Sequence, residues 1–183
     1  MDENKLMKRD FITGSRRFSN YFWACILFLG GFGFFLTGIS SYLKVNFLPF
    51  GDPYQLSFIP QGIVMTFYGV LAITLSAYIS LTIIWDVGSG YNEFDKLNNV
   101  IRIVRKGFPG KNRQILLVYS IKNIKSIKID VKDGINPKRT IYLCTKDNRK
   151  IPLTQVGQPQ PLKELENDAA TLAQFLEIEL EGI

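Results

Sequence analysis

Two long stretches without charged side chains constrain this chain more than any other feature. Between Arg17 and Lys44 lie 26 residues without Asp, Glu, Lys or Arg, and between Asp52 and Asp86 lie another 33. A helix that crosses the hydrocarbon core of a bilayer needs about 20 largely apolar residues. The sequence therefore predicts two transmembrane helices, over about residues 18–43 and 62–85, with a connecting loop over residues 44–61.

The distribution of Lys and Arg predicts the orientation of these helices. Of the 22 basic residues, five precede the first span, one lies in the connecting loop and sixteen follow the second span. Flanks rich in Lys and Arg remain on the side of the membrane where the protein is made. We therefore expect both termini on that side, with residues 1–17 as a short N-terminal segment and Arg16 and Arg17 as topology anchors.

Small residues in both apolar stretches indicate close helix packing. Such residues let helix backbones approach each other, which favours a hairpin and leaves open docking against a helix of another membrane protein. Neither stretch contains an ionisable residue of the kind that proton relays and ion pathways use, so a transporter is not expected. The small residues are Gly30, Gly31, Gly33 and Gly38 in the first stretch, and Gly69, Ala72, Ser76 and Ser80 in the second.

The remaining chain, residues 86–183, has the pattern of a soluble α+β domain. From Val100 onward apolar and polar residues alternate, which predicts five antiparallel strands between about residues 98 and 156. Apolar residues then recur every three or four positions over about residues 161–176, which predicts an amphipathic helix with Leu165, Leu172 and Leu176 buried. The predicted fold is an antiparallel sheet closed by a C-terminal helix, similar to a pleckstrin-homology domain.

Several kinds of catalytic site are absent from the sequence. The chain has no His, which excludes Ser-His-Asp and Cys-His nucleophiles and most zinc sites. Glu93 and Asp95 could form a carboxylate pair, but we expect them to be solvated. Residues 88–90, Gly-Ser-Gly, lack the pattern of a phosphate loop and are expected to be a flexible joint. We predict no catalytic, cofactor-binding or metal-binding residue, and hence no enzyme.

The two cysteines, Cys25 and Cys144, lie in different regions of the chain, and neither is expected to form a disulfide. Unpaired cysteines suit a reducing compartment.

Charge is concentrated in one part of the soluble domain. Residues 86–150 contain 15 Lys and Arg against 6 Asp and Glu, whereas residues 151–183 contain one basic residue against six acidic ones. A basic segment next to a bilayer attracts anionic lipid head groups or an acidic protein surface; nucleic acid is not expected as a partner. We hypothesise a partner-binding cluster that consists of Arg102, Arg105, Lys106, Lys111 and Arg113.

Four strings of residues carry a resemblance to a known family. They are TGSRRFSNYFWACILFLGG over Thr13–Gly31, FIPQGIVMTFYG over Phe58–Gly69, WDVGSGYNEFDK over Trp85–Lys96, and GFPGKNR over Gly107–Arg113. Together they resemble the photosystem I assembly factors of plastids and cyanobacteria, first named as hypothetical chloroplast open reading frame four. The resemblance extends from about Phe11 to Leu176. Lys106 departs from it, because an aromatic residue often precedes the Gly-Phe-Pro-Gly turn, and the acidic tail after Leu176 matches less well.

The resemblance implies a role in photosynthesis. Members of this family are multi-pass thylakoid membrane proteins of plastids, or of cyanobacteria, with two spans and a soluble domain on the stromal or cytoplasmic side. They are non-enzymatic scaffolds for photosystem I assembly. The implied partners are photosystem I core subunits and other assembly factors, and no cofactor is implied. Membrane lipids are expected as a further partner because of the basic segment, and homo-oligomerisation is left open. The alternative function is a membrane-anchored lipid- or protein-binding module with a basic pleckstrin-like domain.

Overall fold

The computed structural model describes residues 6–49, 51–132, 134, 137–154 and 161–181. The chain forms two compact units. One, which we call the helical unit, consists of residues 15–87. The other, the sheet unit, combines residues 1–14 with residues 88–183. The helical unit is therefore inserted in sequence between two segments of the sheet unit.

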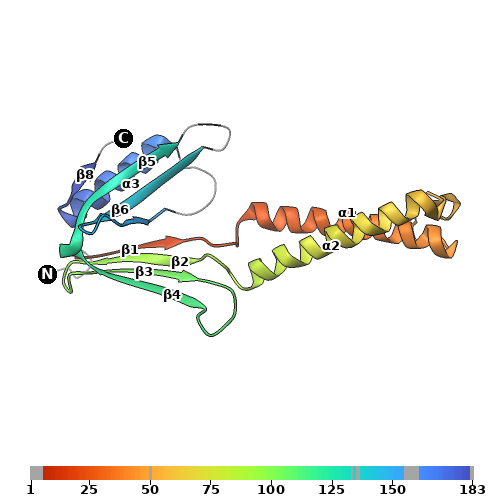
Figure 1. Cartoon of the computed structure of the whole chain (residues 1–183), viewed down its shortest axis with the longest axis horizontal. Helices are drawn as coiled ribbons and strands as arrows, with labels where there is room; N and C mark the ends of the chain where they lie inside the picture. The colour runs from red at the N-terminus through yellow and green to blue at the C-terminus, as the bar shows by residue number, and fades with distance from the viewer. Residues whose placement is uncertain (1–5, 50, 133, 135–136, 155–160, 182–183) are drawn as a thin grey trace. The chain divides into compact units, whose positions relative to one another are not determined.

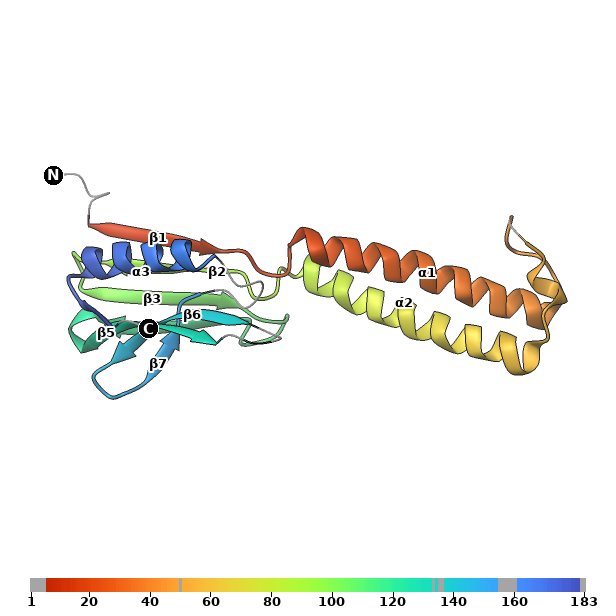
Figure 2. The same ribbon diagram turned by 90° about the horizontal axis from the view of Figure 1, so that it is seen from above.

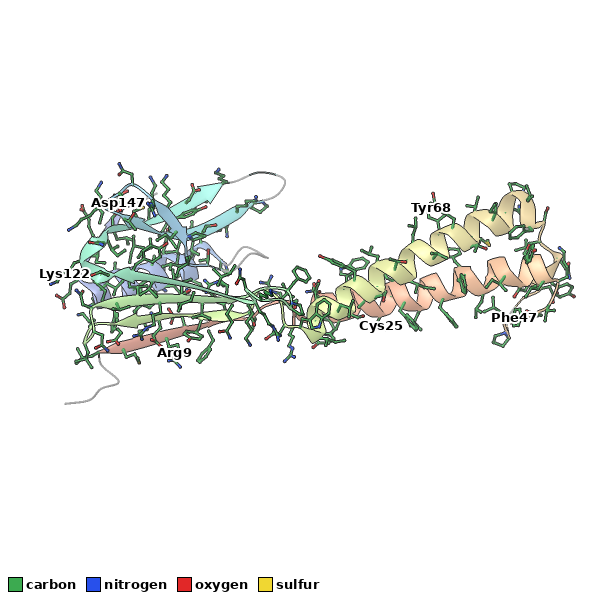
Figure 3. All side chains as sticks on the ribbon, turned by 60° about the horizontal axis from the view of Figure 1, so that its bottom comes forward. Arg9, Cys25, Phe47, Tyr68, Lys122 and Asp147 are labelled. Carbon is green, nitrogen blue, oxygen red and sulfur yellow. The ribbon has the colours of Figure 1, made fainter. Side chains whose placement is uncertain are left out.

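The helical unit contains two long helices, α1 (Phe18–Leu43) and α2 (Ile63–Ile84), shown in Figure 1. A 3₁₀ turn, η2 (Pro53–Gln55), and a π turn, η3 (Phe58–Gly62), lie in the connection. Both helices are long and apolar enough to span a membrane, and most of their side chains are exposed, unlike those of a core helix in a soluble protein. Figure 3 shows these side chains, including the labelled Cys25 and Tyr68.

Small residues bring α1 and α2 together. A Cβ atom added to Gly69 would lie 2.5 Å from the backbone nitrogen of Phe35, and one added to Gly31 would lie 2.8 Å from the Cβ of Ala72. The hydroxyl of Ser76 donates a hydrogen bond to the carbonyl of Ala24 at 2.7 Å. The predicted hairpin packing is thus confirmed. Gly30 and Gly33 take no part in it, because nothing lies within 4 Å of a Cβ built on either.

The sheet unit contains two four-stranded sheets. Sheet A is antiparallel, in the order β1 (Met7–Ile12), β2 (Gly90–Asp95), β3 (Val100–Lys106) and β4 (Gln114–Ser120). Sheet B has the order β7 (Lys150–Pro152), β6 (Lys138–Thr145), β5 (Ile124–Lys132) and β8 (Glu179–Glu181), with β8 parallel to β5. A short 3₁₀ turn, η4 (Ile121–Asn123), connects the two sheets. Figure 2 shows the same strands from above.

Both sheets and helix α3 (Leu162–Leu176) contribute to one hydrophobic core. Phe94 and Ile101 from sheet A, Ile127 and Leu143 from sheet B, and Leu165 from α3 have no exposed surface. Alternation along each strand places such residues on one face, and a repeat of three to four residues does so on the helix. The predicted burial of Leu165, Leu172 and Leu176 is confirmed, since none is more than 4% exposed.

The sequence analysis missed three strands. It assigned residues 1–17 to a segment of their own, but Met7–Ile12 is β1, which pairs with β2 from Met7 opposite Asp95 to Ile12 opposite Gly90. It predicted neither β2 nor the parallel β8. All three strands are short and rich in polar residues, so their alternation of apolar and polar residues is weak. The end of the last predicted strand, Gln155 and Val156, lies outside the described residues.

Candidate functional site

The hypothesised cluster of five basic residues is divided among three environments. Successive side chains of a strand point to opposite faces, so Arg102 and Arg105 on β3 face opposite sides of sheet A. Lys111 and Arg113 lie in the exposed loop between β3 and β4, and Lys106 is the last residue of β3. The structure therefore does not bring the five residues together on one surface.

Arg102 belongs to a row of three charges across sheet A. Arg9 on β1 lies opposite Glu93 on β2, and Glu93 lies opposite Arg102 on β3. The Nε of Arg9 donates to Oε2 of Glu93 at 2.9 Å, and Nη1 of Arg102 donates to its Oε1. The sequence analysis missed Arg9, labelled in Figure 3, since only strand pairing brings it to a residue 84 positions away. Both guanidinium groups thus bind Glu93 and connect β2 to its two neighbouring strands.

The prediction that Glu93 and Asp95 are solvated is wrong. They are 3% and 2% exposed, because β2 is an inner strand between β1 and β3. Burial opposes the ionisation of Glu93, but the hydrogen bonds and charges of Arg9 and Arg102 outweigh it and hold the pKa of Glu93 below its ordinary value. A buried carboxylate with two cationic partners is ionised and structural.

Asp95 has a different role at the end of β2. Its Oδ1 accepts the backbone N–H of Asn98 at 2.9 Å, and its Oδ2 accepts the side-chain amide of Asn98 at 2.6 Å. These hydrogen bonds from Asn98 lower the pKa of Asp95. Asp95 thereby stabilises the turn between β2 and β3. Because Glu93 and Asp95 each have separate partners, they do not form a carboxylate pair for acid–base chemistry.

Arg105 is also engaged within the fold. Its Nη2 donates to Oδ1 of Asn92 at 2.8 Å, and its Nη1 donates to the carbonyl of Tyr91 at 3.3 Å. Asn92 is buried, and its own amide donates to the carbonyl of Leu153 at 3.0 Å. Arg105 therefore orients a buried amide that links β2 to the chain segment after β7.

The loop from Gly107 to Arg113 is the exposed part of the cluster. The N–H of Gly107 donates to the carbonyl of Arg113 at 2.6 Å, which closes the loop at its base. Lys111 and Arg113 are exposed, as is the ring of Phe108. Of the five predicted residues, these two present the most accessible positive charge.

Gly90 is the first residue of β2, and residues 88 and 89 form hydrogen bonds with the end of β3. The N–H of Gly88 donates to the carbonyl of Lys106, and the N–H of Lys106 donates to the carbonyl of Ser89, both at 2.7 Å. Gly90 has no room for a side chain, since an added Cβ would lie 1.9 Å from the carbonyl oxygen of Val104. Gly88 has a φ of +81°, which favours glycine. The glycines therefore serve strand pairing.

Arg16 has a contact that the sequence analysis did not foresee. Its Nε donates to the carbonyl of Ile83 at 3.2 Å and its Nη2 reaches the carbonyl of Ile84 at 3.5 Å. Asp86 lies 3.9 Å from the same Nε. These carbonyls belong to the last turn of α2, where the helix dipole favours a cation. Arg16 thus caps the second helix, whereas Arg17 is the N-cap residue of the first.

The described part of the chain contains no group of three or more Cys, Asp or Glu residues placed to hold a metal ion. Cys25 is exposed on α1, and Cys144 is buried on β6. In sheet A, Glu93 forms ion pairs with Arg9 and Arg102 within the fold. The β3–β4 loop, by contrast, presents the exposed side chains of Lys111 and Arg113.

Comparison with known proteins extends over both units. The family model described as Ycf4 matches residues 5–174. The chain is 60% identical over 179 residues to the photosystem I assembly protein Ycf4 of Trieres chinensis, covering 98% of this chain and 99% of that protein. It is 59% identical over 176 residues to the protein of that name from Pyropia yezoensis, covering 96% and 95%. The corresponding protein of Trichodesmium erythraeum is 57% identical over 172 residues, covering 94% and 92%. This chain therefore belongs to the Ycf4 family.

Proposed function

We propose that this chain is a non-enzymatic scaffold for the assembly of photosystem I in the thylakoid membrane. The observation that carries the proposal is identity of 53–60% to relatives named photosystem I assembly protein Ycf4, over nearly the full length of this chain. The similarity includes the spans and the sheet unit alike.

In this proposal the helical unit crosses the thylakoid membrane and holds the protein beside photosystem I core subunits. The excess of Lys and Arg outside the connecting loop supports an orientation with both termini on the stromal side, or on the cytoplasmic side in a cyanobacterium. The exposed apolar side chains of α1 and α2 support direct contact with lipid or with helices of other membrane proteins.

The sheet unit has the arrangement of a pleckstrin-homology-like domain in this proposal. Four antiparallel strands are followed by three more and then by the C-terminal helix α3. Two features are added: the helical unit is inserted between β1 and β2, and β8 extends sheet B. Because one fold can serve many functions, the docking role for photosystem subunits and other assembly factors is supported by the exposed β3–β4 loop and not by the fold class.

The basic loop between β3 and β4 is the proposed contact for an acidic partner surface. Lys111 and Arg113 are exposed there. Arg102 and Arg105, by contrast, contact Glu93 and Asn92 within sheet A. Exposed charges are screened within about 8 Å at physiological ionic strength, so this contact should weaken with salt.

The proposal is tested by removing the chain from a photosynthetic host and restoring it. Without the chain, photosystem I should fall several-fold, measured by the light-induced absorbance change of its reaction centre, while photosystem II stays at its normal level. Restoring the chain should restore photosystem I. Equal loss of both photosystems, or no loss of either, would exclude a specific role in photosystem I assembly.

The alternative function is a membrane-anchored lipid-binding module. The exposed Phe108 in the loop that also contains Lys111 favours it, because aromatic and basic side chains suit a membrane interface. Purification in mild detergent distinguishes the two functions. Photosystem I subunits should co-purify with a scaffold, whereas lipid alone should co-purify with a lipid-binding module.

A further inference from the structure

The described strands leave four sheet edges, and these edges differ in their protection. An edge strand presents unpaired backbone N–H and C=O groups that can pair with another strand, and proteins usually protect such edges with charges, proline or short length. The edges of sheet A are β1 and β4, and those of sheet B are β7 and β8.

Three of the four edges carry this protection. β1 contains three consecutive charged residues, Lys8, Arg9 and Asp10. β7 is three residues long and ends in Pro152. β8 is also three residues long, and two of them, Glu179 and Glu181, are acidic. Each of these edges is a poor template for a further strand.

The fourth edge, β4, has no such protection. It is seven residues long and contains no charged residue. Four consecutive apolar side chains are exposed on it: Ile115 by 53%, Leu116 by 57%, Leu117 by 39% and Val118 by 55%. Because successive side chains alternate, both faces of this edge are apolar. Figure 1 shows β4 at the margin of sheet A away from β1.

The fold itself does not require these four side chains to be apolar. None of them belongs to the hydrophobic core, and from β4 only Tyr119 packs against it. A run of three or four exposed apolar residues is unfavourable in water unless another surface covers it. The composition of β4 therefore indicates binding.

We propose that β4 is a docking edge, to which an extended segment of a partner protein adds as a fifth strand of sheet A. Backbone hydrogen bonds supply affinity in such strand addition, and alternate side chains supply specificity. The added strand covers the apolar side chains of β4 on both faces. This inference rests on the proposed scaffold function and deepens it by naming a surface that adjoins the basic loop.

Charge identifies the kind of partner. Residues 96–129, which contain β4, include nine Lys and Arg and no Asp or Glu. Four of the nine, Lys96, Arg102, Arg105 and Lys125, contact acidic or polar groups within the fold. The exposed Lys111 and Arg113 precede the strand, and the exposed Lys122 follows it. A second copy paired through β4 would bring two such basic segments together, which is unfavourable. The occupant is therefore a strand of another protein, apolar in its centre and acidic at both ends.

A binding experiment with defined peptides tests this proposal. The full-length protein in mild detergent is titrated with a labelled peptide, Glu-Asp-Val-Thr-Val-Thr-Val-Glu-Asp, and binding is followed by fluorescence anisotropy. Two control peptides carry Lys in place of every acidic residue, or Pro in place of the central Val. We expect at least tenfold tighter binding of the acidic peptide than of either control, with binding weakened by salt. Hydrogen exchange should slow at the backbone amides of residues 114–120.

A matched pair of variants locates the binding edge. Leu116→Lys places a charge on β4, and Met7→Lys places the same charge on exposed β1 at the opposite edge of the sheet. Leu116→Lys should weaken the acidic peptide at least tenfold, and Met7→Lys should leave it unchanged. A second β4 variant, Leu116→Thr with Val118→Thr, keeps strand-forming residues and should also weaken binding. Circular dichroism checks that each variant is folded.

Three results would overturn the inference. The first is failure of the acidic peptide to bind, or equal binding by the proline peptide. The second is unchanged binding to Leu116→Lys and to the double Thr variant. The third is a dimer that forms through β4 and is lost in Leu116→Lys, which would identify a second copy as the occupant. None of these results bears on whether removal of the chain lowers photosystem I, so the proposed function is judged separately.

Discussion

At the scale of single residues, the charges of sheet A show how strand pairing changes the meaning of a sequence. Glu93 is buried between two guanidinium groups that reach it from neighbouring strands. Taking a carboxylate out of water is costly unless cations and hydrogen bonds compensate. The row from Arg9 to Arg102 supplies both, and it ties β1 to the two strands that follow the helical unit.

The first prediction concerns Glu93→Gln and its dependence on pH. The pKa of Glu93 lies below its ordinary value of 4.5, so the ionised group stabilises the fold above that pH, and this contribution is lost as the pH falls through the lowered pKa. At pH 7 the variant should lose about 2 kcal/mol of unfolding free energy. The difference from the unmodified protein should shrink as the pH is lowered from 5.5 to 3.

Urea unfolding of the full-length protein in detergent, followed by circular dichroism of the sheet, provides the measurement. Asp147→Asn, which alters an exposed carboxylate in the turn between β6 and β7, is the matched control and should change stability little. A difference between Glu93→Gln and the unmodified protein that stays constant with pH would contradict a role for the ionised carboxylate.

At the scale of elements, the two long helices pack against each other, whereas the β3–β4 loop is exposed. The helices approach closely because glycine, alanine and serine lie where they meet. Lipid tails are as apolar as leucine, so close packing and hydrogen bonds hold such helices together. The β3–β4 loop, by contrast, is exposed and carries the charges of Lys111 and Arg113.

The second prediction concerns the hairpin. Gly69→Leu should separate α1 from α2, because even a Cβ at this position would lie 2.5 Å from the backbone of Phe35. Gly33→Leu is the control, since an added Cβ there meets nothing within 4 Å. The measurement is disulfide formation between Ala24→Cys and Ser76→Cys, with Cys25 replaced by Ser. Cross-linking should fall several-fold with Gly69→Leu only, and an equal fall in both variants would contradict the packing.

The third prediction concerns the loop. Lys111→Glu with Arg113→Glu should lower photosystem I accumulation while photosystem II is unchanged, because reversed charges repel an acidic partner surface. Lys146→Glu with Arg149→Glu makes the same change of charge in another exposed turn and should have little effect. Photosystem content is measured by the reaction-centre absorbance change. Normal photosystem I in the loop variant would remove Lys111 and Arg113 from the mechanism and leave the edge of β4 and the spans.

At the scale of the whole molecule, the helical unit interrupts the sequence of the sheet unit. The helical unit is inserted between β1 and β2, and these strands pair so that Ile12 lies opposite Gly90. The chain therefore leaves the sheet unit and returns to it at neighbouring positions. One consequence is that the N-terminal strand and the C-terminal part of the sheet unit must reside on the same side of a membrane that the helices cross.

The fourth prediction tests this topology. A membrane-impermeant maleimide should label Asp147→Cys from the stromal or cytoplasmic side only, and Phe47→Cys from the opposite side only. Both positions are exposed, and Cys25 and Cys144 are replaced by Ala in the background. Labelling of both positions from one side would show that the two helices do not form a transmembrane hairpin, and the reverse pattern would invert the orientation.

The sequence by itself determined the features that depend on local composition. Two uncharged stretches defined α1 and α2 because apolar length is a property of neighbouring residues. The pattern of apolar and polar residues located β3 to β7, and the repeat of leucines located α3. The tertiary structure alone decided that Met7–Ile12 is a strand and that Glu93 is buried, because both depend on pairing across the inserted helical unit. It also decided how the basic cluster is divided. Arg102 and Arg105 form contacts within the sheet, whereas Lys111 and Arg113 remain exposed. The sequence does not show which residue a charged side chain contacts, because the register of the strands determines which residues lie opposite each other.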